Sequence, residues 1–124
     1  MPKPPAISDA EWEVMRVLWQ RSPLTASDVV EALAERKDWS PATIKTLLNR
    51  LVGKRAVGFE AQGKRYLYSP KVGREECVRQ ESRSFLSRVF GSSPGPMLVQ
   101  FVKEAQLTDA EIRQLKQILK EKRP

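Results

Sequence analysis

Hydrogen-bonding and basic side chains recur at helical spacing between residues 42 and 54, on one side of an expected amphipathic helix. Asparagine can pair with adenine, arginine and lysine can bind guanine, and the methyl group of threonine can contact that of thymine. This chemistry predicts a helix that lies in the major groove of DNA. An ordinary solvated helix face explains the residue types about equally well. The residues expected to contact DNA here are Ala42, Thr43, Lys45, Thr46, Asn49, Arg50 and Lys54.

A second basic group follows in an expected turn, where Lys64 and Arg65 precede Tyr66. Such a turn suits a wing that lies on the DNA backbone or in the minor groove. The alternative is a charged turn that only keeps an edge strand soluble. Residues 40–68 hold six basic residues against one acidic residue, which is +5 of the chain's net charge of +7. The charge therefore favours a polyanionic partner at this part of the chain.

Composition argues against catalysis and metal binding. The 124 residues include no histidine and a single cysteine, Cys77. The commonest general base and a cysteine–histidine metal cluster are therefore both missing. We expect no catalytic residue, no metal site and no cofactor. Cys77 is more typical of a small buried residue than of a redox sensor.

Three helices must position these polar groups. Capping boxes begin the first helix at Ser8 and the second at Thr25. The first is expected to end near residue 20, and the second near residues 36–39. Ser40 caps the third helix ahead of a proline, which is favourable at the first helical position. The buried face of this third helix is expected to consist of Ile44, Leu47, Leu48, Leu51 and Val52.

Two short β-like runs, at residues 57–61 and 66–69, flank a turn in which Gly63 suits a positive φ angle. Three helices followed by a hairpin are typical of a winged helix-turn-helix. We therefore predict a mainly α fold with a small β-hairpin. Residues 1–70 are expected to form a winged-helix DNA-binding domain.

Residues 71–124 show no strand pattern and predict three more helices, with a break at residues 91–96. Apolar residues are concentrated at 97–102, and Thr108 begins a capping box for the last helix. Three helices of this length bury little apolar surface by themselves, and small domains of this kind are commonly stabilised by oligomerisation. We predict a helical dimerisation domain at 71–124 that buries its apolar faces against a second copy. Packing of these faces on the N-terminal domain is the alternative.

The chain is not expected to enter a membrane. No apolar run approaches the ~20 residues that a membrane span needs. The first residues, MPKPPAIS, lack the apolar segment of a signal peptide. The cytoplasm is therefore the expected location.

The segment WSPATIKTLLNRLVGKRAVGFEAQGKRYLYSP, at residues 39–70, spans the expected third helix and wing. It resembles the BlaI/MecI/CopY-type bacterial repressors, the penicillinase repressor family. The resemblance covers essentially the whole chain. It extends through ISDAEWEVMRVLW, TASDVVEAL, FLSRVFG and MLVQFVKEAQLTDAEIRQLKQIL.

The resemblance implies a homodimer that binds a palindromic operator similar to TACA…TGTA and blocks transcription. It also implies C-terminal helices that interlock between subunits. Several members are inactivated by cleavage in a pathway with a membrane-bound sensor, and the cleaved bond aligns here with Gln100-Phe101. Glutamine stands where the best-known members have asparagine. The copper-responsive branch binds metal through a C-terminal cysteine cluster, so a chain with Cys77 as its one cysteine lacks that sensing mechanism.

The same sequence features are also compatible with a second function. A winged-helix module that binds another protein, without operator specificity, would share the same fold and dimerise through the same helices. Its basic surface would bind DNA only weakly, independently of sequence and with a steep salt dependence.

Overall fold

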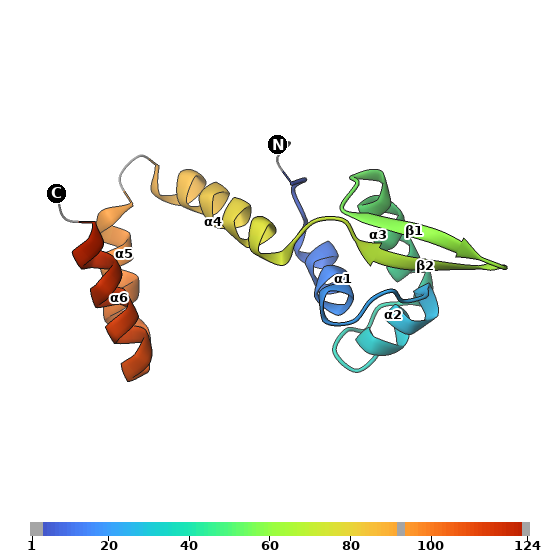
Figure 1. Ribbon diagram of the computed structural model, residues 1–124, viewed down its shortest axis with the longest axis horizontal. Helices are drawn as coiled ribbons and strands as arrows, with labels where there is room; N and C mark the ends of the chain where they lie inside the picture. Colours follow the sequence, from blue (N-terminus) through green and yellow to red (C-terminus); the bar gives the residue numbers. More distant parts are fainter. Residues whose placement is uncertain (1–3, 92–93, 123–124) are drawn as a thin grey trace. The chain divides into compact units, whose positions relative to one another are not determined.

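The computed structural model describes residues 4–91 and 94–122. The chain forms two compact units, Met1–Phe85 and Leu86–Pro124, and the boundary between them along the chain falls within the fourth helix (Figure 1). The division of function at residue 70 stays a prediction. Ser92 and Ser93, which belong to the expected break, lie outside the described residues.

The three predicted N-terminal helices are present, and each begins at its expected cap. The side chains of Ser8, Thr25 and Ser40 each accept a hydrogen bond from the backbone amide three residues later. The second helix is shorter than expected. It ends at Leu33, because the next amide, that of Ala34, bonds three residues back instead of four. The helices are α1 (Asp9–Gln20), α2 (Ala26–Leu33) and α3 (Pro41–Gly53).

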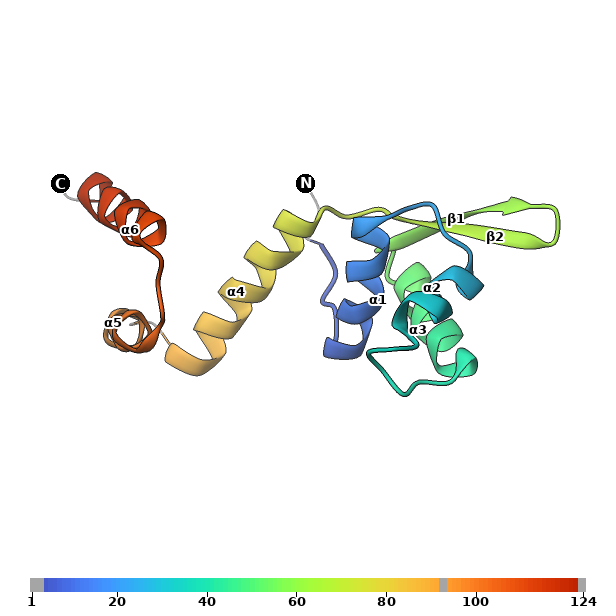
Figure 2. The same ribbon diagram turned by 90° about the horizontal axis from the view of Figure 1, so that it is seen from below.

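One hydrophobic core lies where these three helices meet the base of the hairpin (Figure 2). The helical spacing of apolar residues correctly predicted which side chains α3 contributes to this core, except that Val52 is only partly buried. Trp19 ties α1 to the segment after the hairpin, because its indole N–H donates to the Val72 carbonyl at 3.0 Å. The fully buried side chains of this core include Val14, Met15, Leu18, Val29, Leu33, Ile44, Leu48, Leu51 and Val57.

The hairpin consists of β1 (Val57–Gln62) and β2 (Arg65–Pro70), which pair antiparallel. Gln62 pairs with Arg65, so a two-residue turn joins the strands, and Gly63 in that turn has a φ of 63°. This left-handed conformation is easy for glycine and confirms the reason for expecting it there. The extended segment before α2 adds a bridge, because Leu24 and Tyr68 exchange two backbone hydrogen bonds of 2.7 and 3.0 Å.

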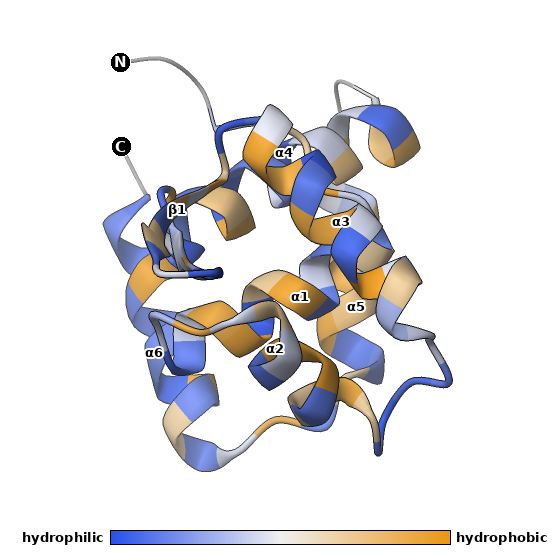
Figure 3. Ribbon diagram, turned by 90° about the vertical axis from the view of Figure 1, so that its right-hand side faces the viewer, coloured by the Kyte–Doolittle hydropathy of each residue, from blue (hydrophilic) through white to orange (hydrophobic). Residues whose placement is uncertain are grey.

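Three further helices follow, as predicted: α4 (Arg74–Phe90), α5 (Gly95–Glu104) and α6 (Asp109–Glu121). The expected capping box of Thr108 and Glu111 begins α6. No side chain of α5 or α6 that the structure describes is buried. Figure 3 shows hydrophobic and hydrophilic residues alternating along α6, as on an amphipathic helix. The exposed apolar side chains of the two helices are Met97, Leu98, Val99, Phe101, Val102, Ile112, Ile118 and Leu119.

Cys77 is the one buried side chain of α4 among the described residues. Burial raises the pKa of its thiol, with a smaller contribution from Glu76. Within the ranges 4–91 and 94–122, no helix has both the length and the apolar character that a bilayer span requires.

Candidate nucleic-acid interface

One side of α3 is exposed over its whole length, opposite the leucine face. All six residues expected on this side, or at its edge, lie in solvent. They are Ala42, Thr43, Lys45, Thr46, Asn49 and Arg50. Helical periodicity thus places the expected reading residues on an accessible surface.

The two threonines of this surface already use their hydroxyl groups locally. The Thr43 hydroxyl lies 3.1 Å from that of Ser40, and the Thr46 hydroxyl donates to the Ala42 carbonyl at 3.0 Å. These hydroxyls keep free acceptor capacity, and the exposed methyl groups of both residues offer apolar contact as well. Such contacts recognise thymine in the major groove.

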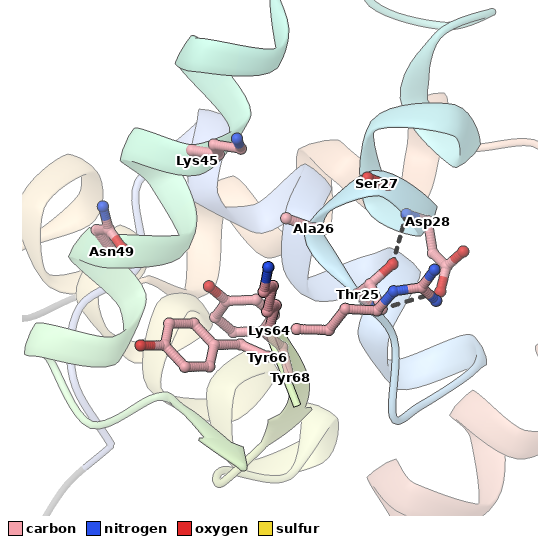
Figure 4. A pocket seen from close by; sticks show the side chains of 10 residues that line it. Thr25, Ala26, Ser27, Asp28, Lys45, Asn49, Lys64, Tyr66 and Tyr68 are labelled. Atoms are coloured by element: carbon pink, nitrogen blue, oxygen red, sulfur yellow. Dashed lines mark hydrogen bonds between the residues drawn. The ribbon is translucent and has the colours of Figure 1, made fainter. Parts of the chain in front are cut away.

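A groove of 580 Å³ lies beside this surface, between α3, the start of α2 and the hairpin (Figure 4). It collects residues from three segments that are far apart in the sequence. Five of its lining residues were predicted to contact DNA: Lys45, Asn49, Lys64, Arg65 and Tyr66. Five others were not in that prediction: Thr25, Ala26, Ser27, Asp28 and Tyr68.

The groove suits an anion because three of its side chains are cationic and one, Asp28, is acidic. The hydrogen bond from the Thr25 backbone amide is the main cause that lowers the pKa of Asp28, with smaller contributions from the Thr25 side chain, Arg21 and Arg65. Asp28 is thereby kept ionised as part of the helix cap. The first amides of a helix lack intrahelical acceptors and favour negative charge. The start of α2 therefore adds donors to a basic groove.

The capping box at Thr25 was visible in the sequence, but its place beside α3 was not. Leu24 pairs with Tyr68, and this bridge joins the start of α2 to the hairpin. The capping box at Thr25 marks where α2 begins, but it does not say which segment the residue before it pairs with. The pairing partner of Leu24, 44 positions later, is set by the tertiary fold.

Lys54, the last of the residues expected to contact DNA, does not line this groove. It caps the C-terminus of α3, and its ammonium group donates to the carboxylate Oε1 of Glu11 and to the Ala6 carbonyl at 2.9 Å. Its intramolecular role is therefore to hold the end of α3 against the start of α1. A DNA contact of Lys54 stays a prediction that the groove does not support.

Glu11 is 1% exposed and also accepts a hydrogen bond from the Ser8 amide at 2.8 Å. Burial by itself raises the pKa of this carboxyl group. The hydrogen bonds from Lys54 and from Ser8 outweigh that effect, so the pKa lies below its ordinary value of 4.5. The carboxylate is therefore ionised in the folded protein at neutral pH.

Replacing the lysine of this pair, as Lys54→Met, is expected to lower the free energy of unfolding by about 2–3 kcal/mol. The loss stays below that of a fully buried pair because the Lys54 side chain is 36% exposed. Chemical unfolding at neutral pH measures it, with the exposed Lys71→Met as control. Equal stability of the two variants would contradict a structural role for the pair.

The same pair predicts a pH dependence. A carboxyl group with a lowered pKa stabilises the fold fully above its unfolded pKa, and this contribution disappears as pH falls through the lower, folded pKa. Wild-type stability is therefore expected to decrease on acidification below about 4.5, and Lys54→Met should lose less over the same interval. Unfolding curves at neutral and acid pH measure both losses, and equal losses would rule out the pair as their source.

Residues 7–121 match the family model of the penicillinase repressor. The chain belongs to the penicillinase repressor family. It is 38% identical over 121 residues to the penicillinase repressor of Bacillus licheniformis, covering 98% of this chain and 94% of that protein. It is 33% identical over 116 residues to the methicillin resistance regulatory protein MecI of Staphylococcus aureus, covering 94% of each. The match to a family of transcriptional repressors confirms the resemblance inferred from sequence.

Solved structures of the penicillinase repressor family confirm the winged-helix fold class. The DNA-binding domain of the repressor BlaI superposes with a TM-score of 0.55 at 39% identity, covering 61% of this chain and 93% of that domain. The Bacillus licheniformis BlaI monomer in complex with the blaP half-operator gives 0.54 at the same identity and coverage. MarR of E. coli in complex with operator DNA is 20% identical with a TM-score of 0.51, over 95% of this chain and 76% of MarR, which shows a shared fold.

Proposed function

We propose that this transcriptional repressor acts as a homodimer, in which each protomer binds one half of a palindromic DNA operator. One observation carries the proposal. The groove beside α3 gathers Lys45 and Asn49 with three wing residues, Lys64, Arg65 and Tyr66. It does so on a fold shared, at 39% identity, with a BlaI monomer whose structure was solved with a half-operator.

Within each half-site, the exposed side of α3 would face base edges in the major groove. Asn49 and Arg50 have the donor and acceptor groups to read adenine and guanine. The wing residues Lys64, Arg65 and Tyr66 would hold the DNA backbone and so fix the register of α3. Recognition and positioning then fall to different elements.

The C-terminal helices support a dimer through what they leave exposed. Met97, Val99 and Phe101 of α5 are each more than 40% exposed, and so are Ile118 and Leu119 of α6. Burying apolar surface of this kind contributes about 25 cal/mol per Å². A second copy of the chain offers the same faces in return, and two-fold symmetry would match a palindromic operator.

Cleavage at Gln100-Phe101 would act on this same region. The bond lies in the second half of α5, where Phe101 is 48% exposed and its ring lies 5.8 Å from that of Phe90. Cutting there would separate α6 and the end of α5 from the rest of the chain. We infer that a pathway starting at a membrane sensor relieves repression by removing this part of the dimer interface.

Footprinting on a duplex with TACA…TGTA half-sites, combined with sedimentation of the complex, tests the proposal. The expected result is symmetric protection of both half-sites by two protomers, with much weaker binding to a scrambled duplex of equal length. Equal affinity for the two duplexes would favour a protein-interaction module instead.

A further inference from the structure

Tyr68 combines a buried ring with a hydroxyl group that lacks a protein partner. The residue is 8% exposed and belongs to the core of the first unit. Across the part of the chain that the structure describes, its hydroxyl oxygen forms no hydrogen bond, although it is not sealed off from solvent. A buried tyrosine hydroxyl usually has a hydrogen-bond partner. Because the Tyr68 hydroxyl is open to solvent and has no protein acceptor, a bound ligand can reach it.

The hydroxyl opens into the groove beside α3. Tyr68 lines that groove together with three cationic side chains, Lys45, Lys64 and Arg65. Figure 4 shows the Tyr68 ring between the hairpin and α3, beside Tyr66. The positive charges around this hydrogen-bond donor attract an anion such as phosphate. The edge of a base is uncharged and gains less from these cations.

The position of this hydroxyl is fixed before any ligand arrives. The Tyr68 backbone is held by both hydrogen bonds to Leu24, and its ring packs 6.0 Å from that of Phe59 and 6.5 Å from that of Tyr66. Burial, with a smaller contribution from Tyr66, also raises the pKa of the phenol, so the group keeps its proton at neutral pH. A donor of this kind loses little conformational entropy on binding.

We propose that the Tyr68 hydroxyl donates a hydrogen bond to a backbone phosphate of the bound DNA. This assignment rests on the proposed function and adds an uncharged residue to the DNA-binding surface. Tyr68 thus serves two purposes, because its ring completes the core and its hydroxyl extends the basic groove.

The test is Tyr68→Phe in the full chain, with binding measured on the palindromic duplex and on a scrambled duplex. Loss of one hydrogen bond to phosphate is expected to weaken binding to both duplexes about threefold to tenfold, leaving their affinity ratio unchanged. The salt dependence should also stay unchanged, because a neutral donor releases no counterion. The thermal unfolding midpoint of the free protein should not move.

Lys64→Ala is the contrasting variant, since removal of a cation from the same groove should lower the salt slope by about one. Wild-type affinity of Tyr68→Phe would overturn the proposal, as would a loss confined to the palindromic duplex, which indicates a base contact. A lower unfolding midpoint would also overturn it, since the hydroxyl would then bond within the protein. If wild type shows no preference for the palindrome, the proposed function fails, whereas the scrambled duplex still reports the phosphate contact.

Discussion

A chain that ends at Gln100 is expected to bind the palindromic duplex at least about a hundredfold more weakly than the full chain. The truncation removes α6 and residues 101–104 of α5, and with them Phe101, Ile118 and Leu119. The winged-helix unit, Met1–Phe85, stays intact. Two linked protomers bind the second half-site as an intramolecular event, and a monomer loses that gain in effective concentration. Binding isotherms and sedimentation on the same samples measure both effects.

Two controls isolate the dimer contribution. A chain that ends at Glu121 keeps the whole of α6 and should behave as wild type. A duplex with a single half-site should bind the Gln100-terminated chain and the full-length chain with similar affinity, because neither uses a second protomer there. The prediction is wrong if the shorter chain sediments as a dimer with undiminished operator affinity.

Lys45→Ala is expected to weaken operator binding about tenfold to a hundredfold. Lys45 is exposed on α3 and shares the groove with Asn49 and with the wing residue Lys64. Its ammonium group can bind guanine or a phosphate, and the two cases differ in their consequences. A base contact reduces the preference for the palindrome, whereas a phosphate contact reduces the salt slope by about one on every duplex.

Lys71→Ala is the matched control, since it removes one positive charge from an exposed lysine that lies outside both the groove and the C-terminal helices. It should leave both affinity and salt slope close to wild type. Arg50→Ala extends the test along α3. If Lys45→Ala and Arg50→Ala both preserve affinity and sequence preference, α3 is not the reading element.

Local features of the sequence predicted the elements well. The caps at Ser8, Thr25 and Ser40 and the turn at Gly63 depend on hydrogen bonds or φ angles within a few residues, so neighbouring residues specify them. The end of α2 was predicted less well. No proline or glycine marks it, and the turn after Leu33 forms as the chain returns to the core at Trp39.

Features that join distant segments escaped prediction. Glu11 and Lys54 are 43 residues apart, and their ion pair gives Lys54 a structural partner that charge and spacing did not reveal. Tyr68 was not among the residues expected to contact DNA, and only the packed structure shows that it is buried in the core and also lines the groove.

The sequence by itself determined the helices, the hairpin, the basic segment at residues 40–68 and the family, because these depend on local hydrogen bonding, periodicity and residue type. The tertiary structure decided which polar groups line one groove and which form hydrogen bonds or ion pairs within the protein. The partner of each polar group depends on packing between distant segments, because burial and steric fit select one partner among many of the same chemical type. Lys45 and Lys54 are both lysines of α3, one within the helix and one at its C-terminal cap. Only the fold shows that Lys45 lines the groove and that Lys54 pairs with Glu11.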